Sequence, residues 1–160
     1  MRPSSKLWKR LYTIAWAVWL FDFATKVWAI NNLSASNPTK IIGNFLQLTL
    51  IRNSGAAFSL AQGATIVFTI FAILVVGAIA YYAPRITSGG WSVVLGLALG
   101  GVLGNLTDRI FRTPGYFTGR VIDWIELTHW PVFNLADSAI VVAAGIAIVL
   151  SIRNISPMGA

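Results

Sequence analysis

Acidic side chains are scarce in this chain, and their grouping is the first sign of chemistry. Of the five acidic residues, three fall between Arg120 and Asp137: Asp123, Glu126 and Asp137. A carboxylate kept near hydrocarbon costs about 2.5–3.5 kcal/mol at mid-bilayer, so each one retained there is a functional candidate. We predict that Asp123 and Asp137 face each other at the outer edge of a membrane bundle and work as a pair.

The composition indicates a membrane protein. The chain has 160 residues, of which 56% are hydrophobic and 11% charged, with a mean hydropathy of +0.72, whereas a soluble domain carries about 25% charged residues. We expect a single membrane domain covering residues 1–160. The absence of cysteine excludes thiol catalysis, and a single histidine argues against a multi-ligand zinc site. No metal or other cofactor is expected.

Four hydrophobic segments approach the ~17–25 residues that a tilted transmembrane helix needs. They cover residues 11–30, 64–82, 91–107 and 137–152. The first follows a basic start like that of a signal peptide, but it exceeds the ~7–15 apolar residues of a cleavable one. We therefore expect it to be a retained helix.

Basic residues set the expected orientation. Four of the twelve lie in the first ten positions, which places both chain ends in the cytoplasm when four spans follow. The net charge of +7 is then a matter of topology rather than of nucleic-acid binding. The connections 31–63 and 108–136 become extracytoplasmic, and residues 41–50 suit a short strand or hairpin on the membrane surface.

An up-and-down bundle brings distant polar residues together. The end of the first span, the end of the third and the start of the fourth share one side, so Asp22, Lys26, Asp108 and Asp137 converge there. Asp123, expected in the loop between the third and fourth spans, lies on the same side. This convergence does not depend on the orientation in the membrane.

Two of the polar motifs also have simple structural explanations. Asp22 and Lys26 can form an ion pair on one helix face, or Lys26 can extend to the interface while Asp22 anchors the rim of a site. The polar stretch 52–58 can be a helix start capped by Asn53 or Ser54. Alternatively, Asn53 donates hydrogen bonds to a substrate backbone and the adjacent glycine permits close approach. That glycine is Gly55.

The third predicted span carries glycines every four residues, a pattern typical of close packing against a neighbouring helix. They are Gly96, Gly100 and Gly104. The polar residues that follow can finish the helix, or they can support a site in which Asn105 or Arg109 touches substrate. They are Asn105, Asp108 and Arg109.

The two candidate catalytic aspartates also have purely structural explanations. Asn134 can cap the fourth span with Asp137 in its first turn, and Asp123 can pair with Arg120. The catalytic pair is preferred because no other residue set supports catalysis. His129 has no obvious acidic partner, and no serine is placed to form a dyad with a lysine.

Together these motifs resemble those of lipoprotein signal peptidase (signal peptidase II), a family of bacterial membrane aspartyl peptidases. Five stretches match in the family's order and span most of the chain. They are D-F-A-T-K at 22–26, R-N-S-G-A-A-F at 52–58, G-G-V-L-G-N-L-T-D-R at 100–109, G-R-V-I-D-W at 119–124 and F-N-L-A-D at 133–137. Two features depart from the family pattern and concern the substrate rim: the segment between Arg109 and Gly119 is long, and Trp124 stands where phenylalanine is common.

The resemblance implies an all-α membrane protein of four transmembrane helices with a small extracytoplasmic β-sheet. It implies a catalytic pair at Asp123 and Asp137. Other residues match the family's supporting positions. These are Asn53, Asn105, Asp108, Arg109 and Asn134, with Asp22 and Lys26 in the first motif.

The resemblance also implies a reaction and a setting. The expected substrate is a prolipoprotein signal peptide, cut just before a diacylglyceryl-modified cysteine by a water that the two carboxyl groups activate. The expected location is the inner (cytoplasmic) membrane of a bacterium, with the site near the outer leaflet. We expect a monomer surrounded by membrane lipids.

Two other classes of function remain open. A small proton-coupled transporter would use Asp22 or Asp108 as its proton site and predicts carboxylates near mid-bilayer. A non-catalytic assembly subunit, packed through its glycines, predicts that the aspartates tolerate replacement by asparagine.

Overall fold

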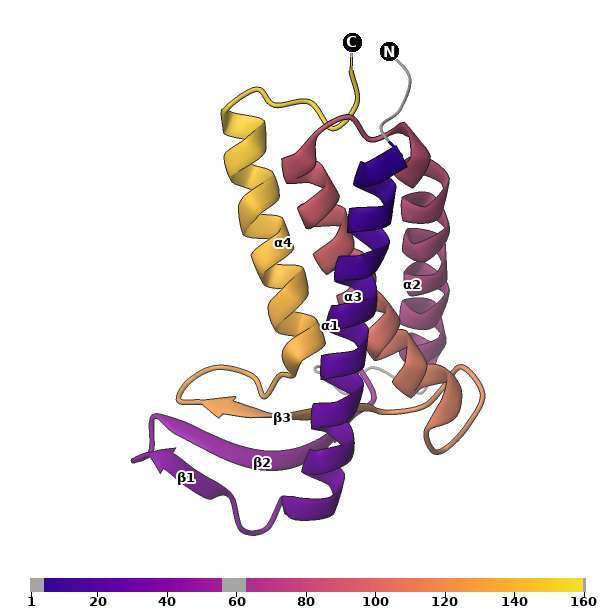
Figure 1. Cartoon of the computed structure of the whole chain (residues 1–160). Helices are drawn as coiled ribbons and strands as arrows, with labels where there is room; N and C mark the ends of the chain where they lie inside the picture. Colours follow the sequence, from indigo (N-terminus) through magenta and orange to yellow (C-terminus); the bar gives the residue numbers. More distant parts are fainter. Residues whose placement is uncertain (1–4, 56–62, 160) are drawn as a thin grey trace.

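The structure is a computed structural model that describes residues 5–55 and 63–159. Four long helices form a bundle, with the two chain ends at one end and a small sheet at the other (Figure 1). The prediction of a four-helix membrane fold with a small sheet is therefore confirmed. The helices are α1 Ser5–Asn32, α2 Gly63–Tyr82, α3 Gly89–Phe111 and α4 Leu135–Ile152, with a short 3-10 helix, η1 Ala83–Arg85, after α2.

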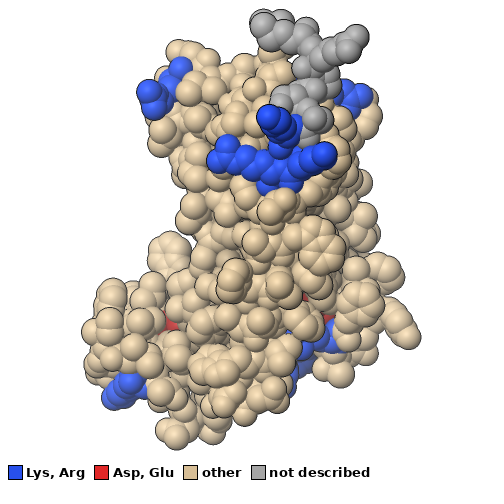
Figure 2. Space-filling view, in the orientation of Figure 1, with Lys and Arg blue, Asp and Glu red and all other residues tan. Residues whose placement is uncertain are grey.

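All four helices are long and apolar enough to cross a membrane. Each contains one predicted segment and extends beyond it at one or both ends. Large apolar side chains such as Phe71, Leu74 and Val141 are exposed on their outer faces, which is expected of helices that contact lipid. Figure 2 shows Lys and Arg gathered toward the two ends of the molecule, with a broad middle band free of them.

The helix α3 packs against the other three helices. A methyl group on Gly100 would lie 2.6 Å from Cβ of Val18 in α1, and one on Gly101 would lie 2.5 Å from the carbonyl oxygen of Ala136 in α4. The small residues therefore allow the helix backbones to approach closely. The predicted glycine packing is confirmed, and it lies within one chain.

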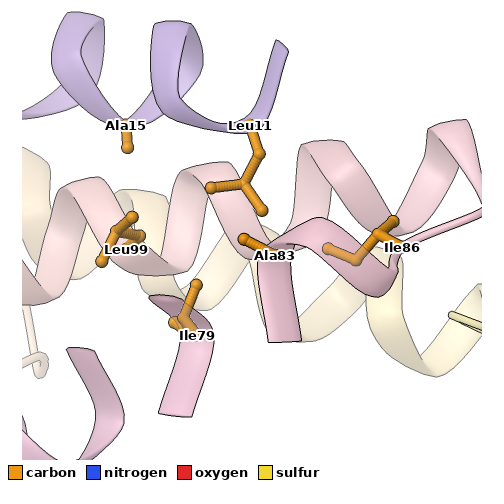
Figure 3. Close-up of a cluster of buried hydrophobic side chains, with 6 residues drawn as sticks. All are labelled: Leu11, Ala15, Ile79, Ala83, Ile86 and Leu99. Atoms are coloured by element: carbon orange, nitrogen blue, oxygen red, sulfur yellow. The ribbon is translucent and has the colours of Figure 1, made fainter. Parts of the chain in front are cut away.

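A cluster of buried apolar side chains joins α1, α2, η1 and α3 at the end that holds the chain termini (Figure 3). Its members come from both sides of the α2–α3 connection, so they fix the turn between these helices. They are Leu11, Ala15, Ile79, Ala83, Ile86 and Leu99.

The sheet contains three antiparallel strands in the order β1-β2-β3. They are β1 Thr39–Ile42, β2 Leu46–Asn53 and β3 Val121–Leu127. The predicted hairpin is β1 and β2, and its turn contains Gly43 at φ +51°, a conformation that glycine adopts without strain. The expected loop around Asp123 is instead strand β3, in which Asp123 pairs with Ile51 of β2.

Candidate active site

Asp123 is a buried carboxyl group on the central part of β3. It is 2% exposed, and each of its oxygens accepts one hydrogen bond. The side chain of Asn53, at the end of β2, donates to Oδ2 at 2.9 Å, and that of Asn134 donates to Oδ1 at 2.6 Å. The pairing of β2 with β3 brings Asn53 to this position. The alternative of Asn53 or Ser54 as a helix cap is wrong, because Asn53 lies in β2 and Gly55, at φ +82°, does not have a helical backbone.

Asp137 lies in the first turn of α4. The side chain of Asn134 accepts a hydrogen bond from the Asp137 backbone, and the Asp137 carboxylate accepts one from the Asn134 backbone, which is a reciprocal capping box. The other carboxylate oxygen, Oδ1, accepts from the side chain of Asn105 at 2.7 Å. The predicted cap is confirmed, and it fixes the direction in which Asp137 points.

Asn134 joins the two aspartates. Its side-chain amide is fully buried, donates to Asp123 and caps the helix turn that contains Asp137. The same amide nitrogen also lies 3.1 Å from the side-chain oxygen of Asn105 and 3.3 Å from the carbonyl oxygen of Ile122. One residue therefore couples the first half of β3 to the start of α4, and it connects Asp123 with Asp137.

Lys26 holds together a second group of charges beneath this pair. Its ammonium lies 2.8 Å from the carboxylate of Asp22 and 2.8 Å from that of Asp108, and it donates to the side-chain oxygen of Asn105 at 2.9 Å. The predicted ion pair with Asp22 is confirmed. The expectation that Lys26 extends to the interface is wrong: the side chain is 1% exposed, because its partners on α1 and α3 lie inside the bundle.

The two carboxylates bound by Lys26 each hold the backbone next to one candidate catalytic residue. Asp22 accepts a hydrogen bond from the N–H of Ala136 at 2.9 Å, and Asp108 accepts one from the N–H of Ile122 at 3.1 Å. Ala136 and Ile122 immediately precede Asp137 and Asp123. Lys26 is thus connected to α4 through Asp22 and to β3 through Asp108; we call these two connections the arms of Lys26. The predicted convergence of these residues is confirmed.

Arg112 makes a further contact that the sequence analysis did not identify. Its guanidinium pairs with the other oxygen of Asp108. The spacing of four residues on a helix was an available signal. With Lys26 on one oxygen and Arg112 on the other, Asp108 is fully compensated, which suits a buried carboxylate.

Arg109 and Gly55 lie beside this network. The guanidinium of Arg109 lies 5.7 Å from the ring centroid of Phe68, and its Nη1 is buried without a hydrogen-bond partner among the described residues. Gly55, at φ +82°, donates its N–H to Asn53, and a methyl group on it would lie 3.0 Å from Phe68 and 3.4 Å from Arg109. Residues 56–58 of the same motif lie outside the described residues.

Burial raises the pKa of Asp123 to about 6, and the negative charge of Asp137 acts in the same direction. The hydrogen bonds from Asn53 and Asn134 favour the ionised form and limit this rise. Two neighbouring carboxyl groups of which one retains a proton form an acid and a base side by side. Among residues 5–55 and 63–159, no group of three or more histidine or acidic side chains could hold a metal ion.

The remaining predicted features are placed as follows. His129 lies in the turn after β3 at φ +64° and is exposed. The ring of Trp124 packs edge-on against Trp28, with the centroids 5.8 Å apart. The segment between Arg109 and Gly119 contains the end of α3 and the loop that follows it, and the Gly119 N–H closes this loop by donating to the Arg109 carbonyl at 2.9 Å.

This fold and site define a multi-pass membrane protein with two linked carboxyl groups at one end of its helix bundle. The comparisons with known proteins agree on a family. The family model described as signal peptidase (SPase) II matches residues 14–153. The chain belongs to the signal peptidase II family.

Related proteins and structures support this assignment. The chain is 46% identical to the lipoprotein signal peptidase of Streptomyces coelicolor over 149 residues, covering 93% of this chain and 73% of the relative. It is 44% identical to that of Mycobacterium tuberculosis, covering 90% and 71%. A solved bacterial membrane enzyme, determined by the in meso method, matches with a TM-score of 0.78 and 28% identity over 91% of this chain and 89% of the other.

Proposed function

We propose that this chain is an aspartic endopeptidase that removes signal peptides from prolipoproteins, cutting just before the diacylglyceryl-modified cysteine. Family membership supports the substrate class. The observation that supports the catalytic type is the buried link through Asn134, which ties Asp123 and Asp137 into one site.

In this proposal the two carboxyl groups share one proton, and Asp123 carries it, because burial favours the neutral form of this residue. Asp137 takes a proton from a water molecule held between the pair, and the resulting hydroxide attacks the scissile carbonyl carbon. Asp123 donates its proton to the carbonyl oxygen, which gives a tetrahedral diol intermediate. As the C–N bond breaks, Asp137 donates the proton taken from water to the leaving amine, and Asp123 takes back a proton from a hydroxyl of the intermediate, so the pair returns to its starting state. Each carboxyl oxygen is already positioned by one hydrogen bond, so little reorganisation is needed.

Arg109 is the residue we assign to the substrate backbone. Its buried Nη1 has no partner in the described part of the chain, and a buried donor of this kind favours an acceptor supplied by a ligand. A peptide carbonyl beside the dyad provides such an acceptor. Asn53, Asn105 and Asn134 have their amides bound to the aspartates, so their first role in this proposal is to position the dyad.

The proposed setting follows from charge. The end of the bundle with the chain termini carries Lys6, Lys9 and Arg10, and basic residues favour the cytoplasmic side. The dyad lies at the opposite end (Figure 1). We place the protein as a single-domain monomer in the inner (cytoplasmic) membrane, with both termini cytoplasmic and the site near the outer leaflet, where a lipidated cysteine would reside.

The test is cleavage of a lipidated prolipoprotein peptide by the purified protein. Asp123→Asn and Asp137→Asn are each expected to lower the rate by more than about 10³-fold, while the variants retain cooperative thermal unfolding. Glu126→Gln is the matched control, because Glu126 shares strand β3 with Asp123 but belongs to no contact of the site, and it should cleave normally. Normal cleavage by either aspartate variant rejects the dyad and favours a non-catalytic role.

A further inference from the structure

A hollow of about 300 Å³ lies beside the active site, at the end of the bundle that carries the sheet. Three arginines line it: Arg52 on β2, Arg112 just after α3, and Arg120 just before β3. Its apolar walls include Ile30 of α1 and Phe111 of α3, and the Phe111 side chain is 79% exposed. The lining of the hollow therefore combines basic and apolar side chains.

Two of these three positive charges are uncompensated. Arg112 pairs with Asp108. All five acidic side chains lie in the described part of the chain, and none of them forms an ion pair with Arg52 or Arg120. Gathering like charges without a counter-charge is unfavourable, so the arrangement favours an anion supplied from outside.

The position of the hollow narrows the choice of anion. Its lining residues Ile30 and Phe111 lie at the ends of α1 and α3 that adjoin the sheet. Trp28 and Trp124 pack together two residues away in sequence from the lining residues Ile30 and Ile122, and tryptophan is typical of the membrane–water interface. Guanidinium groups bind phosphate oxygens through paired, planar hydrogen bonds. An exposed Phe111 beside them offers contact to an acyl chain.

We propose that Arg52, Arg112 and Arg120 form a binding site for the phosphodiester headgroup of an anionic membrane phospholipid. The phosphodiester lies among the three guanidinium groups, and the first part of the lipid tail lies against Phe111 and Ile30. This site is separate from the proposed dyad and needs no catalytic activity in order to bind.

The site adjoins the dyad through the chain. Arg52 directly precedes Asn53, which donates to Asp123, and Ile122 directly precedes Asp123 and pairs with Arg52 across the sheet. An occupied site steadies this corner of the sheet, and so it favours the active arrangement of Asp123. This second effect rests on the proposed peptidase function, whereas lipid binding does not.

The experiment compares retention of labelled phosphatidylglycerol by the full-length protein in bilayer discs of phosphatidylcholine and phosphatidylglycerol at roughly 4:1. The variants are Arg52→Gln, Arg120→Gln and the matched control Lys40→Gln. Lys40 is an exposed cation on β1 of the same sheet that does not line the hollow. We expect each arginine variant to weaken retention roughly fivefold or more, because each loses a charge that lines the hollow. Lys40→Gln should weaken retention less than about twofold, because Lys40 does not line the hollow.

Equal retention by all three variants and the wild type overturns the proposal. Inorganic phosphate, added against chloride at matched ionic strength, tests the source of the anion. Failure of phosphate to displace the labelled lipid supports the lipid as occupant, whereas full displacement assigns the site to a soluble phosphate and overturns it. Thermal unfolding of each variant confirms that the fold is intact.

Activity distinguishes this proposal from the proposed function. Phosphatidylglycerol should raise peptide cleavage by the wild type and by Lys40→Gln, but not by the arginine variants, and all should cleave equally in pure phosphatidylcholine. If the wild type retains the lipid through Arg52 and Arg120 but cleaves nothing in any bilayer, the peptidase proposal fails and the lipid site stands. If cleavage is normal and the lipid has no effect on either binding or rate, the lipid site fails alone.

Discussion

The side chain of Asn134 donates a 2.6 Å hydrogen bond to the carboxylate of Asp123, although the first residue begins a helix and the second lies in a strand. The same side chain caps the backbone of Asp137. One amide thus sets the relative position of two acidic groups on different elements. Replacing Asn134 should therefore show how much the proposed activity depends on the positions of the two aspartates, since both carboxyl groups stay in place in the sequence.

Asn134→Ala is expected to lower kcat for lipidated peptide by about 10²-fold, because it removes a donor to Asp123 and the cap of α4 together. KM should change little, since the residue is buried and its bonds go to the protein. Steady-state cleavage with a lipidated peptide measures both. Gln47→Ala removes an amide from β2 away from the site and should cleave normally; an equal loss in both variants would contradict a specific role for Asn134.

Lys26→Met should be severely destabilising, because it leaves the buried carboxylates of Asp22 and Asp108 without their shared cation. Breaking a buried ion pair costs about 3–5 kcal/mol. Thermal unfolding in detergent should show a large fall in Tm, and Lys40→Met, at an exposed site, should show none. Combining Lys26→Met with Asp22→Asn should recover part of the stability; no recovery would show that loss of charge balance is not the cause.

Gly104→Ala should disrupt the site although the glycine touches no substrate. A methyl group there would collide with the carboxylate of Asp22, the arm that holds the start of α4. We expect a lower Tm and a loss of cleavage. Gly77→Ala in α2 is the matched control, since a methyl group at that position meets nothing within 4 Å, and it should be neutral or slightly stabilising.

The pH dependence follows from Asp123. Burial raises its pKa from 3.8 to about 6, so the folded state favours the protonated carboxyl more than the unfolded state does. The stability gained from this preference is present at low pH and is lost as pH rises through about 6. The Tm of the wild type should therefore fall relative to that of Asp123→Asn between about pH 4 and 6.5 and then level off, as measured by parallel unfolding at each pH.

The rate of peptide cleavage should also fall as the pH rises through about 6. If Asp123 supplies the shared proton, kcat/KM has a descending limb with an apparent pKa near 6 that belongs to the pair. Glu126→Gln should leave this limb in place. A rate that stays level from pH 5 to about 8 would exclude Asp123 as the acid.

The helices and local motifs could be predicted from the sequence because their determinants are local. A bilayer requires a long apolar run, and the Asp22–Lys26 pair and the Asn134–Asp137 cap each depend on residues three or four apart. Strand β3 was missed because its pairing with β2 joins residues about 70 positions apart, such as Ile51 and Asp123. The β-branched and aromatic residues of V-I-D-W-I, from 121 to 125, were a signal for it.

The inward direction of Lys26 could not be predicted for a related reason. A lysine near a helix end in a membrane normally extends to the interface. Here Asp108 and Asn105, both on another helix, join Asp22 in holding the ammonium inside the bundle. The arms from Asp22 and Asp108 to backbone N–H groups have no sequence signature, because any residue supplies such a group. The sequence therefore predicted which residues belong to the site, but not the hydrogen bonds and ion pairs that join them.

The three-way contact of Lys26 also constrains how this chain can diverge. A substitution at residue 22, 26 or 108 alone leaves an unbalanced charge inside the bundle. Each single substitution is therefore destabilising as long as the other two residues are unchanged. Natural or engineered variants should therefore alter these three positions jointly or keep all of them. In that sense they are inherited as one unit, although they come from two helices, α1 and α3, and are separated in sequence by the whole of α2 and most of α3.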